Sequence, residues 1–217
     1  MHALKMAVFD FDGTLVDSVP AIARGIQLAN EEIGIAPVSY DTAKSIIGLG
    51  FKDMIPIVAP DLPESDYGRY KEIYVRYFLQ SDPSLKLFPG TLELLGEIRR
   101  SGIRTAIATG KSRKGLSRIL NRMNIWDYFD DSITADEALP KPDPLMLNTL
   151  IQRNGLRAGD IVMIGDTEHD IKLGKAAGVR TIAVAWGAAP LERLKAFTPD
   201  AIVGTMQELK AKLDEYA

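Results

Sequence analysis

The sequence predicts an α/β protein, with a doubly wound, Rossmann-like core of parallel strands that carries a small inserted all-helical domain. Short apolar runs alternate with helical patterns along most of the chain, and glycines follow several of the predicted helices. One connection near the N-terminus is far too long for a simple crossover. Strands separated by helices of ordinary length are joined by right-handed crossovers, which makes them parallel and puts helices on both faces of the sheet.

The predicted strands are short apolar runs that lack helical periodicity. The first covers 6–9 and leads into an acidic stretch that contains Gly13. The others are 103–109, 161–165 and 180–185, with further candidates at 130–134 and 201–203.

Core helices are predicted where apolar residues recur at spacings of three and four. These segments are 91–100, 112–123, 144–153 and 167–177. Gly102, Gly155 and Gly178 follow three of them closely, as glycines often do at helix C-termini. A strand followed by a helix, repeated along the chain, is typical of a doubly wound sheet.

The connection after the first strand does not fit this alternation. About seventy residues separate Asp17 from Phe88 without a clear strand, whereas a crossover unit needs roughly ten to a few tens. Apolar spacing predicts helices there, at 19–33, 40–47, 51–58 and 64–79. We therefore expect residues 18–84 to form an inserted helical domain, and residues 1–17 and 85–217 to form the α/β core.

Composition limits the class of function. The chain has 217 residues, of which 46% are hydrophobic and 25% charged, and its formal net charge of -3 leaves no global basic field for nucleic acid. No apolar run approaches the roughly 18 residues of a membrane span, and the start of the chain carries no signal pattern, so we expect a cytoplasmic protein without a membrane partner. The absence of cysteine excludes thiol catalysis, and His2 and His169 are too few for a histidine-based zinc site.

The acidic loop after the first strand is the most informative stretch. Asp10 and Asp12 lie at the carboxyl end of a predicted buried strand, which is where open α/β sheets bind ligands. A plain Asp-Gly surface turn would explain the same residues taken alone. A calcium loop does not fit, because Leu15 and Ala21 occupy the positions that need Gly and Glu. Two crowded acids call for a cation such as magnesium, and such a pair can attack a phosphoryl group and protonate the leaving alcohol.

Three later loops offer complementary groups. Thr109 and Gly110 precede a predicted helix, where a hydroxyl and free amides can bind phosphate. Lys141 stands among prolines that stiffen its loop, while Asp166 and Asp170 lie at the start of another helix. Each loop alone has an ordinary explanation, as a helix cap, a solvated lysine or acids favoured by a helix dipole. Together they would supply phosphate donors, a cation and a metal ligand to one site.

These four motifs closely resemble those of the haloacid dehalogenase superfamily, in its phosphatase branch, and occur in that family's order over nearly the whole chain. They are Asp10-Phe11-Asp12-Gly13-Thr14, Thr109-Gly110-Lys111, Lys141-Pro142 and Gly165-Asp166-Thr167-Glu168-His169-Asp170. The inserted helical domain is similar to the family's type-one cap. Phe88-Pro89-Gly90 and Trp186-Gly187 resemble the phosphoglycolate-phosphatase-like subgroup.

The resemblance implies a magnesium-dependent phosphatase that hydrolyses small phosphate monoesters through an aspartyl phosphate, with phosphoglycolate as a first candidate. It implies that Asp10 is the nucleophile and Asp12 the general acid and base. It also implies that Thr109, the Gly110 amide and Lys141 bind the phosphate. Many relatives have Asn where this chain has Gly110, so a side-chain contact to phosphate would be missing.

The resemblance also implies a set of metal ligands. Mg²⁺ would be held by the Asp10 carboxylate, the Asp12 carbonyl oxygen and Asp166, with Asp170 supporting the metal waters or Lys141. The substrate would be a small phosphorylated metabolite, and the protein a monomer or a homodimer.

Several alternatives within and outside this family remain. Dehalogenases lack an acid at the position of Asp12, phosphomutases carry a cap histidine that this insert lacks, and phosphonoacetaldehyde hydrolases use a cap lysine, for which Lys44 and Lys52 show no sign of burial. A non-enzymatic phosphoacceptor, like a receiver domain, would not need the helical insert. Within the insert, Lys52 and Arg24 are candidates to contact a second anionic group of the substrate, although both residue types are common on surfaces.

Overall fold

The computed structural model describes residues 3–217, so His2 lies outside the described residues. Its sheet has the strand order β3-β2-β1-β4-β5-β6, and all neighbouring strands are parallel. The strands are β1 (Met6–Phe9), β2 (Arg104–Thr109), β3 (Asp131–Thr134), β4 (Ile161–Gly165), β5 (Arg180–Val184) and β6 (Ala201–Val203). The predicted doubly wound α/β core is confirmed, and the two further strand candidates form its edges.

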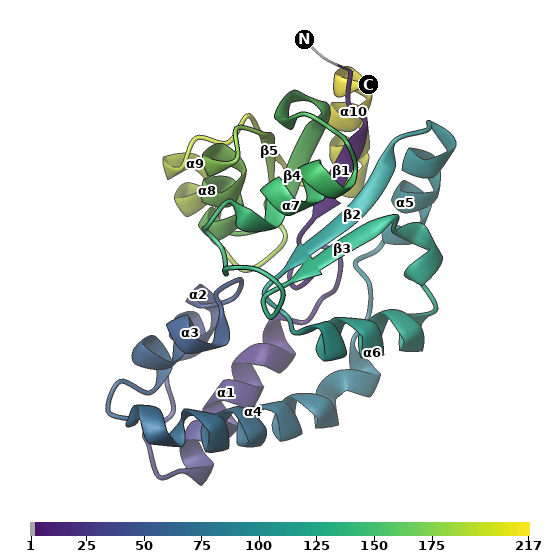
Figure 1. The fold of residues 1–217 in the computed structure, drawn as a ribbon. Helices are drawn as coiled ribbons and strands as arrows, with labels where there is room; N and C mark the ends of the chain where they lie inside the picture. The colour runs from purple at the N-terminus through teal and green to yellow at the C-terminus, as the bar shows by residue number, and fades with distance from the viewer. Residues whose placement is uncertain (1–2) are drawn as a thin grey trace.

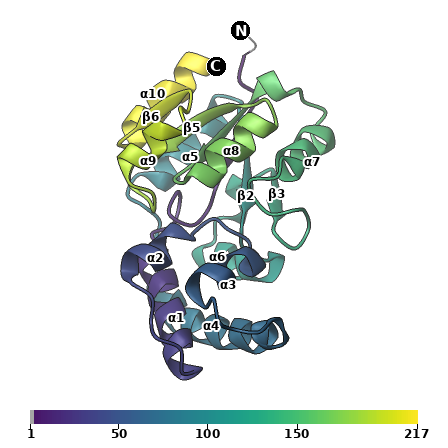
Figure 2. The ribbon, with the colours of Figure 1, turned by 90° about the vertical axis from the view of Figure 1, so that its left-hand side faces the viewer.

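The strands of the sheet are buried on both faces. In β1, Ala7 and Phe9 pack against one hydrophobic cluster, while Met6 and Val8 pack against another. The first cluster includes residues of α5 (Thr91–Arg100), α6 (Arg113–Met123) and α10 (Met206–Tyr216), and the second includes residues of α7 (Leu145–Arg153) and α8 (Glu168–Ala176). Figures 1 and 2 show the helices on both sides of the sheet. Continuous apolar strands therefore replace the alternating pattern of a half-exposed sheet.

Two core helices were absent from the sequence prediction. One is α9 (Leu191–Ala196), a six-residue helix too short to show a period, and the other is α10. In α10 the signal was present, because the buried residues Met206, Leu209 and Leu213 follow helical spacing.

The long connection after β1 forms four helices that lie together beside the carboxyl edge of the sheet, away from both chain ends (Figure 1). They are α1 (Val19–Glu32), α2 (Tyr40–Ser45), α3 (Phe51–Val58) and α4 (Tyr67–Ser81). A buried Asn30 joins three of them, since it accepts a hydrogen bond from the Tyr70 hydroxyl at 2.7 Å and donates one to the Val58 carbonyl at 2.6 Å. We call α1 to α4 the cap helices; the boundaries 18–84 of a separate domain stay a prediction.

A helix that crosses a bilayer must be both long and apolar. Within residues 3–217, none of the helices is both long enough and apolar enough to cross a bilayer.

Candidate active site

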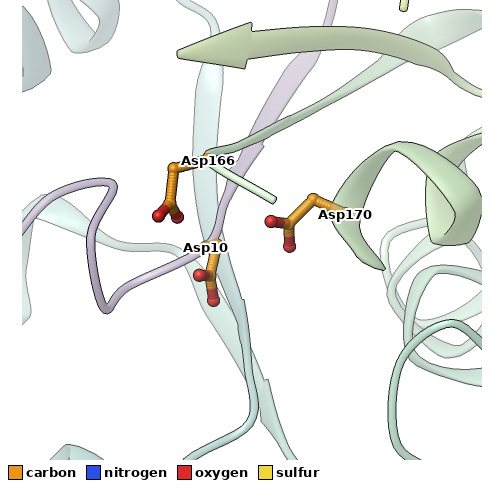
Figure 3. A group of neighbouring side chains, drawn as sticks. All are labelled: Asp10, Asp166 and Asp170. Atoms are coloured by element: carbon orange, nitrogen blue, oxygen red, sulfur yellow. The ribbon is translucent and has the colours of Figure 1, made fainter. Parts of the chain in front are cut away.

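Three carboxylates meet at the carboxyl edge of the two central strands. Asp10 directly follows β1, Asp166 directly follows the neighbouring β4, and Asp170 lies in the first turn of α8. Each offers an oxygen within 4.8 Å of the others, and all three residues are buried (Figure 3). Parallel pairing of β1 with β4 brings the first two together although 155 positions separate them in the chain, so the sheet builds this cluster.

Lys141 lies between two of these acids. Its Nζ donates to Asp10 Oδ1 at 2.7 Å and to Asp170 Oδ1 at 2.6 Å, and its side chain is fully buried. Burial on its own would lower the pKa of this ammonium group, but the charges of Asp10 and Asp170 outweigh it and raise the pKa above the ordinary range. Lys141 therefore stays protonated and fixes both carboxylates.

The other oxygen of Asp170 is held by the start of its own helix. Asp170 Oδ2 accepts from the Thr167 amide at 3.1 Å and from the Thr167 hydroxyl at 2.8 Å, which is a capping box at the start of α8. Both carboxylate oxygens of Asp170 thus have protein partners. Its observed contact is with Lys141, one of the two supporting arrangements that the family resemblance implied.

Asp10 and Asp166 together carry more negative charge than the neighbouring Lys141 balances. Burial, followed for Asp10 by the charges of Asp170 and Asp166, raises the pKa of Asp10 well above its usual range against the opposing effect of Lys141. Burial and the charge of Asp170 raise the pKa of Asp166 to about 7, against hydrogen bonds from the Ala188 amide and Thr14. Asp10 Oδ2 is buried and has no hydrogen-bond partner among residues 3–217. A buried orphan oxygen beside excess acid fits a hard divalent cation.

Asp12 lies outside the carboxylate cluster and lines a cavity between the cap helices and the core. Its Oδ1 accepts from the Ser18 hydroxyl at 2.5 Å, and its Oδ2 lies 3.0 Å from Lys111 Nζ. Lys111 also stands 4.5 Å from the centre of the Phe78 ring on α4, so it connects the core to the cap helices. Asp12 is buried but reachable, which suits a group that exchanges protons with a bound substrate.

Gly110 shows why the second motif departs from the common pattern. Thr109 ends β2, fully buried, and its hydroxyl accepts from the Lys111 amide at 3.2 Å. At Gly110, a Cβ atom would stand 3.1 Å from the Leu49 carbonyl oxygen and 3.3 Å from that of Gly48. The loop between α2 and α3 passes close to Gly110, and a side chain there would push that loop back by a few tenths of an ångström.

A cavity of about 770 Å³ lies between the cap helices and the core, with Asp10, Asp12 and Gly110 among its lining residues. Lys52 also lines it. Arg24 does not: it lies on α1, with its side chain 57% exposed and 3.8 Å from Glu31. The cavity therefore brings together Asp10, Asp12, Gly110 and Lys52, and Arg24 lies outside it.

Four groups at the site were not assigned a role from the sequence. Thr14 donates to Asp166 Oδ1 at 2.8 Å, and the Ala188 amide donates to Asp166 Oδ2 at 2.6 Å. Ser18 and Lys111 hold Asp12 as described. Thr14 and Lys111 belong to the recognised motifs and could have been singled out there, whereas nothing in the sequence indicates the Ala188 amide.

The family assignment rests on a match over most of the chain. Residues 7–184 match the model of the haloacid dehalogenase-like hydrolase family. The chain belongs to that family. A phosphoglycolate phosphatase from Vibrio parahaemolyticus is 31% identical to it over 216 residues, covering 95% of this chain and 94% of that protein. A probable phosphatase, IndB, from Dickeya dadantii is 32% identical over 211 residues, covering 94% and 91%.

Solved structures agree with this assignment. A candidate haloacid dehalogenase-like hydrolase from Bacteroides fragilis superposes with a TM-score of 0.87 at 26% identity, covering 95% of this chain and 99% of that one. A hydrolase from Pseudomonas syringae, 20% identical, gives a TM-score of 0.89 with 98% and 99% covered, which shows the shared fold. The chain is thus a phosphatase-type enzyme of this hydrolase family.

Proposed function

We propose that this enzyme hydrolyses small phosphate monoesters through a phosphorylated Asp10 and depends on magnesium. The carrying observation is the orphan oxygen of Asp10, buried beside Lys141 and Asp166 and adjoining the cavity that Asp12 also lines. One carboxylate is held for attack by a protonated lysine, and a second faces the space for a leaving group.

The reaction proceeds in two displacements at phosphorus. The Asp10 carboxylate attacks the phosphoryl group and the ester P–O bond breaks, while Asp12 gives its proton to the departing alcohol oxygen. Asp12 then takes a proton from a water molecule that attacks the phosphorylated Asp10, and inorganic phosphate leaves with the Asp10 carboxylate restored. Lys141 holds Asp10 in place and offsets negative charge throughout, because its charge is fixed by two acids.

Metal and phosphate contacts follow from the same cluster. Asp10, the Asp12 carbonyl oxygen and Asp166 would hold Mg²⁺, which when bound neutralises charge on the transferring phosphoryl group. Thr109 and the Gly110 amide, at the carboxyl end of β2 next to β1, are assigned to the phosphate oxygens. Asp12 supports ester hydrolysis over dehalogenation, since a halide leaving group needs no proton.

A substrate class follows from the relatives. Phosphoglycolate is the candidate that the Vibrio parahaemolyticus protein's name suggests for this chain, and small phosphorylated metabolites are the wider class.

The test is phosphate release from a panel of monoesters, with magnesium and with a chelator. We expect magnesium-dependent multiple turnover that falls on the order of 10³-fold or more in Asp10→Asn. Asp41→Asn, at an exposed position on α2, is the matched control and should keep wild-type turnover. Full turnover in Asp10→Asn or in chelator would overturn the proposal. A single phosphate retained per chain, without turnover, would support a phosphoacceptor instead.

A further inference from the structure

The cap side of the cavity is an aromatic wall. Phe51 begins α3, and Tyr74 and Phe78 lie one turn apart on α4. The Tyr74 ring centre is 6.3 Å from that of Phe51 and 6.2 Å from that of Phe78. All three rings line the same cavity as Asp10 and Asp12. We call these three residues the aromatic wall.

The wall lines a cavity that glycolate would not fill. A cavity of about 770 Å³ falls within the roughly 300–1,000 Å³ of sites that bind ligands of drug size. Val75 and Leu79, beside the wall on α4, also line the cavity and remain 37% and 39% exposed. Apolar surface left open inside a cleft next to polar chemistry indicates a ligand with an apolar part.

Helix α1 supports the Tyr74 ring on the side away from the cavity. Its ring packs against α1 at Gly25, where a Cβ atom would stand 3.4 Å from the ring carbon Cε2. Burial, together with the charge of Asp12, raises the pKa of the Tyr74 phenol. No hydrogen bond from the Tyr74 hydroxyl is found within residues 3–217.

Three of the cations that line the cavity stand beside the wall; Lys71 lies 5.6 Å from the centre of the Phe51 ring, and the other two are paired with acids. Lys111, next to Phe78, lies 3.0 Å from Asp12 Oδ2. Arg118 bonds both oxygens of Asp82, at 3.1 and 3.2 Å. At Lys111 and Arg118, a carboxylate on the leaving group would compete with these protein acids, whereas a neutral ring would not.

We propose that the preferred substrate is the phosphate monoester of an alcohol bearing a planar aromatic ring, which packs against the aromatic wall. This inference rests on the proposed phosphatase function. The ester P–O bond breaks, and the oxygen leaves with the ring-bearing alcohol after taking its proton from Asp12. Two kinds of alcohol carry such a ring: a nucleoside and a simple aryl-substituted alcohol.

Matched esters test the ring directly. Adenosine 5′-monophosphate and ribose 5-phosphate share one reacting hydroxyl and differ by an aromatic base, and benzyl phosphate is paired with ethyl phosphate. Stacking of one base on aromatic side chains is worth about 1–3 kcal/mol, so we expect kcat/KM to be about 5- to 150-fold higher for the aromatic member of at least one pair. The pair that shows the preference identifies the source of the ring.

Variants of the wall provide the second readout. In Tyr74→Leu and Phe78→Leu, the ratio of kcat/KM between the aromatic ester and its partner should fall about 10-fold, mainly through a higher KM. Tyr77→Leu is the matched control, because Tyr77 lies on the same helix but bonds Glu32 and does not line the cavity. That variant should keep the wild-type ratio.

The outcomes separate the two proposals. Magnesium-dependent release that is equal for both members of each pair, or highest for phosphoglycolate, with no effect of the wall variants on the ratio, would overturn the aromatic preference and leave the phosphatase function standing. Absence of magnesium-dependent release from every ester would overturn both.

Discussion

The Asp166 carboxylate packs closely against the protein backbone. A Cβ atom at Gly13 or Gly187 would overlap the Asp166 carboxylate, and the Ala188 amide donates to it directly. Gly13 also has a positive φ of 80°, whereas Gly187 does not lie in that region. Gly187 is therefore required by close approach alone, and it sets the position of a carboxylate assigned to the metal.

Gly187→Ala tests this packing. The added methyl group must push Asp166 aside, so we expect phosphate release to fall by roughly 10- to 100-fold and unfolding free energy to fall by about 1–3 kcal/mol. Steady-state kinetics and urea unfolding measure the two effects. Gly204→Ala, where the nearest atom to the new Cβ would be a glutamate oxygen at 3.5 Å, is the control and should be close to wild type. Activity of Gly187→Ala within two-fold of wild type would show that Asp166 has room to adjust.

At the scale of elements, hydrogen bonds connect the N-terminal ends of the central strands, opposite the ends that carry Asp10 and Asp166. Asp160 ends a short 3₁₀ turn just before β4. Its carbonyl accepts from the Lys5 amide at 2.8 Å, and its carboxylate accepts from the Arg157 amide at 3.0 Å. The Lys5 carbonyl in turn accepts from the amide of Arg104, the first residue of β2, at 2.9 Å. Asp160 thus ties the starts of β4, β1 and β2 together.

The titration of Asp160 predicts a pH-dependent stability. Hydrogen bonds from the Arg157 side chain and amide, with nearby positive charge, hold its pKa at about 2 in the folded protein, against about 3.9 for a free aspartate. The ionised form therefore stabilises the fold above pH 4, and this contribution is lost as pH falls from about 4 to about 2. Asp160→Asn should lower the urea midpoint at pH 7, and the difference from wild type should shrink near pH 2.5.

Asp214→Asn is the control for this experiment. Asp214 is an exposed partner of Lys210 on α10, and its removal should change the midpoint little at either pH. A difference for Asp160→Asn that is the same at both pH values would contradict the assigned titration.

At the scale of the whole molecule, the cap helices meet the core at separate points around the cavity. The loop at Gly48 and Leu49 lies over Gly110, and a Cβ atom at Gly50 would stand 2.9 Å from Pro140. On the other side, Asp82 at the end of α4 pairs with Arg118 on α6. These contacts enclose the cavity from two directions, so the cap can select the leaving group while the core performs the chemistry.

A double-mutant cycle measures the second contact. Asp82 is nearly buried and is held by two bonds from Arg118, so Asp82→Asn and Arg118→Gln should show a coupling in unfolding free energy of about 1–2 kcal/mol. The same cycle on the exposed pair Lys210 and Asp214 should give less than about 0.5 kcal/mol. Additive effects at Asp82 and Arg118 would mean that this pair does not hold the cap to the core.

The spacing of apolar residues along the chain was enough to predict the parallel core. The motifs at the ends of the predicted strands were enough to identify the loops that carry Asp10, Lys141 and Asp166. Both signals depend only on residues close together in the sequence. It failed for α9, whose six residues are too few to show a period. The carboxyl ends of parallel strands meet at one edge, so the gathering of these loops followed from topology.

Contacts between distant segments required the tertiary structure. Arg24 and Lys52 looked alike in sequence, yet only Lys52 lines the cavity, because helix packing decides which face of α1 points inward. The aromatic wall, the Lys111 contact with Asp12 and the Ala188 amide on Asp166 arise in the same way, from side chains and backbone brought together across the fold. The spacing of residues in the sequence holds no information on such distances. The motif residues alone therefore indicated the class of reaction, whereas the packing of distant segments decided the size and lining of the substrate cavity.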